Sequence, residues 1–245
     1  MNSSDAEAEV APEPTASKSD AWSDLALTLP IFVGYHLGVV FLPVRNAADL
    51  VTHELVELAS TSLLAYAGLT LALGVAFVAV LLAVGRGQEL RLGRFVWIAA
   101  EGVLYAVAMR LVAGYVVGRL TLAGDESGVE ALGPFAGLVM SLGAGFYEEI
   151  AFRVVLFGLG AKLIRLFAEP IPFAQVRLLT VVWAVLAAVA FSGWHYVGEL
   201  GDPFELRSFL FRAVCGLLFT IIYAFRGFAP AVWTHVIYDV WVLVL

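Results

Sequence analysis

The chain has 245 residues, of which 61% are hydrophobic and only 14% are charged. Soluble domains usually carry about 25% charged residues, so this chain has too few polar groups to cover a water-soluble globule. The composition argues against a cytosolic enzyme, a disordered protein and a nucleic-acid-binding protein, and it favours a polytopic membrane protein that contacts the lipid bilayer.

Most of the net charge of −7 lies at the N-terminus. Residues 1–24 contain six acidic residues and one basic residue, and they are rich in Ala, Ser and Pro. Because such a segment cannot bury enough apolar surface to fold, we expect residues 1–24 to form a disordered acidic tail. Residues 25–245 are then the integral membrane domain. Its single cysteine, Cys215, excludes an internal disulfide and a cysteine-based metal site.

A membrane-spanning helix needs about 20 mostly apolar residues. By this measure the sequence predicts an all-α transmembrane helix bundle with about seven spans and one interfacial helix. The spans are predicted at 25–44 (interrupted by Pro30), 61–84, 95–118, 134–160, 178–197, 207–225 and 229–245, and the interfacial helix at 48–60.

Basic and acidic loops alternate along the chain. Lys and Arg gather after the second, fourth and sixth predicted spans, and Asp and Glu after the third and fifth. Because cytoplasmic loops are enriched in Lys and Arg, the N-terminus is predicted to be cytoplasmic and the C-terminus extracytoplasmic.

The fourth predicted span contains two adjacent carboxylates and an arginine. An ionisable residue inside a span costs about 2.5–3.5 kcal/mol on insertion, so it marks a candidate functional site. Glu149 and Arg153 are four residues apart and share a helix face, so the spacing predicts an ion pair. Glu148 is rotated by about 100° from Glu149 and faces another part of the protein. It is a candidate general base; alternatively, the motif is a buried ion pair that joins helices, and Glu148 has no catalytic part.

Later spans add two histidines. The fifth span ends in Phe191-Ser-Gly-Trp-His195, and the last contains His235-Val-Ile-Tyr-Asp239, whose first and last members share one helix face. Taken alone, His195 reads as a structural residue. The second motif could orient an imidazole, hold a metal or satisfy two buried polar groups.

The third span also carries ionisable residues, Glu101 and Arg110. These two are about 180° apart around the helix, so each is expected to meet a partner on another span.

Three motifs in this order on three spans, EExxxR, FxxxH and HxxxD, resemble the CPBP family of intramembrane endopeptidases, the CAAX-processing, bacteriocin-processing, Abi or Rce1-like group. The resemblance covers about residues 130–245, the protease-like core. It implies that Glu148 and His195 activate a water molecule that attacks a peptide carbonyl, and that Glu149 and Arg153 support the site.

The resemblance also implies that His235 and the residue four positions later stabilise the oxyanion. The commoner family pattern has Asn there, whereas this chain has Asp239, which can only accept a hydrogen bond when ionised. Asp239 is then protonated, orients His235 or binds a metal. Family members have been described as both metallo- and glutamate-type proteases. The absence of a His-Glu-x-x-His pair favours metal-free chemistry, and zinc held by Glu148, His195 and His235 is the alternative.

The expected substrate is a membrane-anchored protein or peptide, cut near a C-terminal anchor or sorting segment. Because His195 is predicted near the extracytoplasmic end of its span, we expect the site to face outward from a bacterial inner membrane, which makes prenylated CAAX peptides less favoured. The alternatives are a non-proteolytic adaptor or immunity protein on the same scaffold and a proton-coupled transporter, which would usually show an internal repeat.

Overall fold

A computed structural model of the chain describes residues 21–42, 46, 48–49, 62–84, 93–118, 133–167, 171–197 and 201–245. Within these ranges every regular element is helical, which confirms the predicted all-α class. The predicted interfacial helix at 48–60 lies outside the described residues except for its first two positions. Residues 1–20 of the predicted tail also lie outside them.

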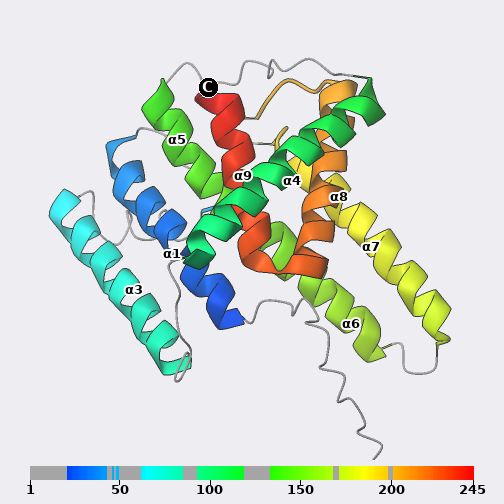
Figure 1. Cartoon of the computed structure of the whole chain (residues 1–245), viewed down its shortest axis with the longest axis horizontal. Helices are drawn as coiled ribbons and strands as arrows, with labels where there is room; N and C mark the ends of the chain where they lie inside the picture. Colours follow the sequence, from blue (N-terminus) through cyan, green and yellow to red (C-terminus); the bar gives the residue numbers. More distant parts are fainter. Residues whose placement is uncertain are drawn as a thin grey trace, which may run out of the picture.

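The helices follow one another in a simple order (Figure 1). They are α1 (Ala21–Gly38) with a 3-10 turn (Val39–Phe41), α3 (Leu63–Val84), α4 (Gly93–Val117), α5 (Pro134–Gly143), the π-helical segments η3 (Ala144–Glu148) and η4 (Ile150–Leu159), α6 (Gly160–Phe167), α7 (Phe173–Trp194), α8 (Leu206–Arg226) and α9 (Phe228–Leu243).

Four helices of the described chain are long and apolar enough to cross a membrane: Trp22–Phe41, α4, α7 and α8. Two shorter apolar helices are Leu63–Ala79 and Phe228–Leu243. The sequence predicts seven full spans. Three predicted spans are not among these four. The fourth is divided between α-helical and π-helical segments, α9 has only 16 residues, and the apolar helix Leu63–Ala79 within the second predicted span is also short.

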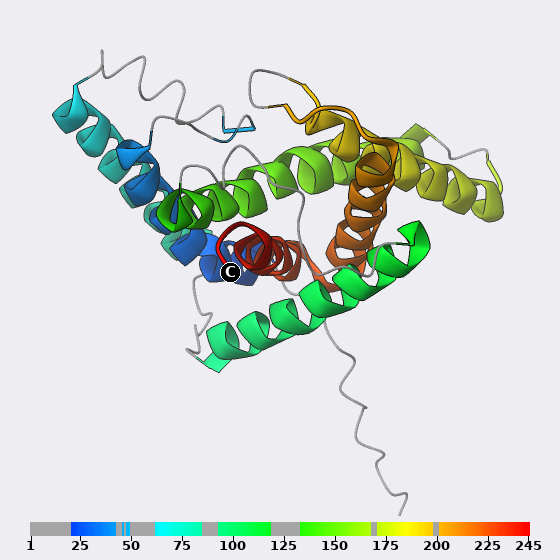
Figure 2. The same ribbon diagram turned by 90° about the horizontal axis from the view of Figure 1, so that it is seen from above.

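Helix α9 occupies the centre of the bundle, where it contacts α1, α4, α5 and α8. Figure 2 shows it nearly end-on, between α4 and the helical run that starts with α5. Side chains from α1, α5, η3 and α9 form one buried cluster, and side chains from α4, α7 and α8, including Cys215, form another. Helix α3 lies at the edge beside α1 (Figure 1).

The first helix begins within the stretch predicted as a tail. Helix α1 starts at Ala21 and continues through Pro30 without the predicted interruption. Asp24 is buried, and its carboxylate accepts the backbone N–H groups of Phe228 (2.9 Å) and Ala229 (3.2 Å) at the start of α9. These N–H groups have no partner inside their own helix, and a negative charge is favoured at a helix N-terminus. Asp24 therefore belongs to the helix bundle and not to the predicted tail.

The helical run at the fourth predicted span, 134–160, is longer than predicted. Its helical run starts at Pro134 and continues to Phe167, past Lys162 and Arg165. The run is unbroken because long basic side chains can extend from an apolar helix towards water, so two basic residues need not end it. The predicted loop at this point starts seven residues too early.

A glycine allows α9 to approach this helical run closely. A Cβ atom at Gly145 would lie 3.0 Å from the backbone nitrogen of Val236 and 3.2 Å from the carbonyl oxygen of Val232. Helix packing at such a distance is typical of small residues in membrane bundles. Since Gly145 is three positions before Glu148, this contact sets how close the acidic pair lies to α9.

We predict that Gly145→Ala lowers the free energy of unfolding by about 1–3 kcal/mol, because backbone atoms of α9 cannot move aside for the added methyl group. The matched control is Gly68→Ala on α3, where a Cβ would meet no atom within 4 Å. There the higher helix propensity of alanine should leave the stability unchanged or slightly raised. Thermal unfolding of both variants in detergent checks this, and equal stability of the two would contradict the close packing.

Candidate active site

The acidic pair lies in the π-helical part of the Pro134–Phe167 run. Glu148 is the last residue of η3, and Glu149 lies between η3 and η4. π-Helical turns are wider than α-helical turns and are frequent at functional sites. A neighbouring helix satisfies one backbone group of this stretch: the indole N–H of Trp183 on α7 donates to the carbonyl oxygen of Leu156 (2.9 Å).

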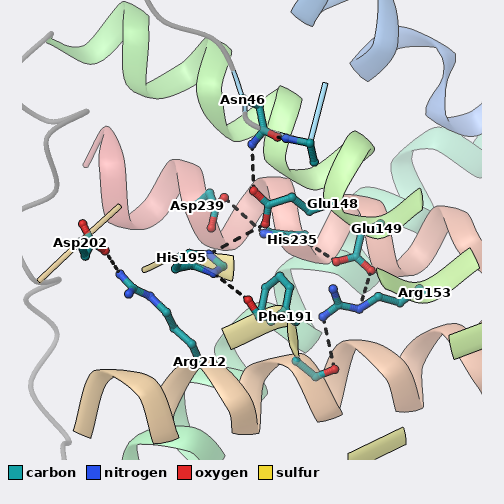
Figure 3. Close-up of polar contacts among 12 residues, drawn as sticks. Asn46, Glu148, Glu149, Arg153, Phe191, His195, Asp202, Arg212, His235 and Asp239 are labelled. Atoms are coloured by element: carbon teal, nitrogen blue, oxygen red, sulfur yellow. Dashed lines mark hydrogen bonds and ion pairs between the residues drawn. The ribbon is translucent and has the colours of Figure 1, made fainter. Parts of the chain in front are cut away.

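Glu148 faces His195, as the resemblance implies (Figure 3). Glu148 is 6% exposed, and its Oε2 lies 3.9 Å from Nε2 of His195. This separation is longer than a direct hydrogen bond. Among the described residues, Oε2 accepts no hydrogen bond, whereas Oε1 accepts one from Nδ2 of Asn46 (2.8 Å). One oxygen of the carboxylate is therefore held, and the other faces the histidine.

His195 is held at the end of α7 in a defined orientation. Its Nδ1 donates to the carbonyl oxygen of Phe191 (3.0 Å), which can only accept. In the neutral ring, Nε2 is then the unprotonated nitrogen, and it is the one that faces Glu148. The backbone carbonyl of His195 accepts the N–H of Asp202 (2.9 Å), and Asp202 pairs with Arg212 on α8.

Glu149 and Arg153 form the predicted ion pair. Nε of Arg153 lies 3.1 Å from Oε2 of Glu149, and both side chains are 1% exposed or less. The Arg153 guanidinium also lies 4.2 Å from the ring centre of Phe191 and donates to the carbonyl oxygen of Gly216 (3.3 Å). The arginine thus joins the acidic helix to α7 and α8.

His235 lies between two carboxylates. Its Nδ1 donates to Oε1 of Glu149 (2.7 Å), and its Nε2 lies 3.4 Å from Oδ2 of Asp239. The ring stacks on Phe219, with ring centres 4.5 Å apart. The three predicted motifs therefore meet: Glu148 contacts α7 through His195, and Glu149 contacts α9 through His235.

Asn46 is a site residue that the sequence analysis missed. It lies after the first predicted span, in a stretch with no motif, and nothing in its spacing relates it to Glu148. The two ionisable residues of the third predicted span have partners on other helices, as expected. Glu101 pairs with Arg226 (2.6 Å), and Arg110 donates to the hydroxyl of Tyr238 (3.3 Å).

The zinc alternative requires Glu148, His195 and His235 to share one ion. Both nitrogens of His235 already lie against carboxylates, those of Glu149 and Asp239. Within the described ranges, no three His, Cys, Asp or Glu side chains are grouped so that they could hold a metal ion. The proposed ligand set therefore does not fit a zinc ion in this arrangement.

Comparison with protein families identifies the segment that carries these motifs. Residues 130–241 match the family model described as type II CAAX prenyl endopeptidase Rce1-like. This segment is therefore an Rce1-like domain of the CPBP family, which is a family of intramembrane peptidases, and the resemblance drawn from the three motifs is confirmed. Neither the curated proteins nor the solved structures gave a match to the chain.

Removing one member of the buried ion pair should be costly. We predict that Arg153→Met lowers the free energy of unfolding by about 3–5 kcal/mol, because it leaves the carboxylate of Glu149 buried with less compensation. The control is Glu101→Gln, which breaks the partly exposed pair with Arg226 and should cost less than about 1 kcal/mol. Denaturation in detergent compares the two, and a small effect at Arg153 would contradict a structural ion pair.

Because no three candidate ligands are grouped within the described ranges, we predict that the chain retains no stoichiometric zinc. Metal analysis after purification should find far less than one zinc ion per chain, and dialysis against a chelator should leave the melting temperature unchanged. One tightly bound zinc ion, with a melting temperature that falls when the metal is removed, would contradict this arrangement.

Proposed function

We propose that the chain is an endopeptidase that hydrolyses a peptide bond in a membrane-anchored protein or peptide, without a metal ion. The observation that carries the proposal is the 3.9 Å separation between Oε2 of Glu148 and Nε2 of His195, inside a domain of an intramembrane protease family. Two acceptors at this separation suit a water molecule that donates one hydrogen to each of them, about 2.8 Å from both.

In the proposed reaction, Glu148 takes a proton from this water as the water oxygen attacks the peptide carbonyl carbon. His195 accepts the other hydrogen of the water and so orients its lone pair towards the carbonyl. The proton on Glu148 then passes to the amide nitrogen, the carbon–nitrogen bond breaks, and a carboxylic acid and an amine leave. The hydrogen bond from His195 to Phe191 supports this role, since it turns the unprotonated nitrogen towards the water.

The remaining motif residues act through charge and position. Glu149 and Arg153 form a fixed pair, and Glu149 also accepts from His235. Of the three roles open to Asp239, the 3.4 Å contact with Nε2 of His235 supports orienting that ring. In this proposal His235, held by both of these carboxylates, stabilises the oxyanion.

The proposed substrate is a protein with a C-terminal anchor or sorting segment on the outer face of a bacterial inner membrane. The alternation of basic and acidic loops supports this orientation, because it places the N-terminus inside and His195 near the outer end of its span. A second candidate is a prenylated peptide with a C-terminal CAAX sequence, which the description of the matching family favours.

We predict that Glu148→Gln and His195→Ala each lower the cleavage rate by about 100- to 10,000-fold, the usual contribution of general acid–base catalysis. Cleavage is measured on reporter proteins that carry either type of C-terminal segment, expressed with each variant in cells.

Glu101→Gln serves as the control, because Glu101 pairs with Arg226 rather than with the site, and membrane insertion of all variants is checked by immunoblot. Undiminished cleavage by both site variants would end the protease proposal. Unchanged biological function without any cleavage would favour the non-proteolytic adaptor.

A further inference from the structure

The carboxylate of Glu148 is held from outside the segment that matches the protease family. Asn46 lies between α1 and α3, more than 80 residues before the start of the match at residue 130. It is 8% exposed, and its Nδ2 donates to Oε1 of Glu148 at 2.8 Å. A part of the chain without any family motif thus contacts the proposed general base directly (Figure 3).

The orientation of the Asn46 amide is fixed by a second contact. Its Oδ1 accepts the backbone N–H of Ala48 (2.8 Å). If the amide were turned over, its oxygen would face the carboxylate of Glu148 and its NH₂ group would face another N–H donor. Both contacts would then be repulsive, so the side chain presents a donor to Glu148.

The turn that carries Asn46 is itself attached to the buried core. The carbonyl oxygen of Asn46 accepts the N–H of Asp49 (3.0 Å). Tyr35 on α1, which is completely buried, accepts the N–H of Asn46 at 3.4 Å and donates to Asp49 Oδ2 at 2.7 Å. Because one tyrosine hydroxyl contacts both ends of the turn, the Asn46 backbone is positioned by α1.

A neutral amide donor affects a carboxylate differently from the way a cationic partner does. Glu149 is compensated by Arg153 and lies against His235, and such a carboxylate is held by strong charge-assisted contacts. The described partner of Glu148 Oε1 is a neutral N–H donor, which orients the group without an opposite charge. Oε2 accepts no hydrogen bond within the described residues and lies on the His195 side.

We propose that Asn46 is a positioning residue for catalysis: it anchors one oxygen of Glu148 so that the other faces His195 and the attacking water. This inference rests on the proposed endopeptidase function. By this proposal the chain before residue 130 contributes to the reaction through Asn46, which lies after the 3-10 turn Val39–Phe41. Asn46 acts through Glu148 and does not itself contact the substrate.

The test compares purified Asn46→Ala and Asn46→Asp with the native chain in detergent. The probes are two quenched fluorescent peptides, one farnesylated with a C-terminal CAAX sequence and one unprenylated with an apolar C-terminal tail. We expect Asn46→Ala to lower kcat by about 10- to 100-fold with little change in KM, because a misplaced catalytic group affects the chemical step. Asn46→Asp should lose at least as much, since two carboxylates would then face each other.

Thr28→Val is the matched control. Thr28 is a buried polar residue on α1 whose hydroxyl donates to the carbonyl oxygen of Asp24 (3.0 Å), so this variant loses a buried hydrogen bond away from Glu148. It should keep the native kcat even if its melting temperature falls. A native kcat in Asn46→Ala, or a loss of activity that only follows the folded fraction, would overturn the positioning role.

Glu148→Gln distinguishes a failure of the positioning role of Asn46 from a failure of the endopeptidase proposal. If Glu148→Gln is inactive and Asn46→Ala is fully active, the positioning role fails and the endopeptidase proposal stands. If Glu148→Gln cleaves normally, or the native chain cleaves neither probe, the endopeptidase proposal is contradicted and the positioning role falls with it.

Discussion

Two adjacent carboxylates, Glu148 and Glu149, are buried in an apolar helix bundle. The rest of the site depends on the different partners that compensate the two negative charges. A buried charge is tolerated only when opposite charges or hydrogen bonds replace its hydration. Glu149 has both, from Arg153 and His235, and it therefore stays fixed. Glu148 has an amide donor on one oxygen and a histidine 3.9 Å from the other. This asymmetry supports the proposed role of Glu148 as the residue that activates water.

The bundle keeps this asymmetry because distant parts of the chain are joined at α9. Asp24 on α1 binds the first N–H groups of α9, and the indole of Trp233 on α9 donates to the carbonyl oxygen of Leu27 (3.0 Å). Gly145 lets the acidic helix lie close against the same helix. The position of Asn46 depends on α1, so the first helix and the family domain contribute to one structural unit around the site.

Much of the site follows from sequence spacing, and the exceptions have physical causes. The four-residue spacing predicted the Glu149–Arg153 pair, which survives in the wider π-helical turns. Hydropathy cannot distinguish α-helical from π-helical turns, so the division of the fourth span was not predictable. Asp24 was assigned to the tail because it follows a run of acidic residues, although its partners are backbone groups more than 200 residues away. Asn46 has no periodic or motif signal, since its contact with Glu148 depends on how a loop folds back.

An experimental structure that resolves ordered water tests the central claim about Glu148 and His195 most directly. We expect one water molecule within hydrogen-bonding distance of both Oε2 of Glu148 and Nε2 of His195, with the amide of Asn46 on the other carboxylate oxygen. A Glu148 side chain turned towards lipid, or one paired directly with a cationic group and with no water at His195, would contradict the claim that these two residues activate water.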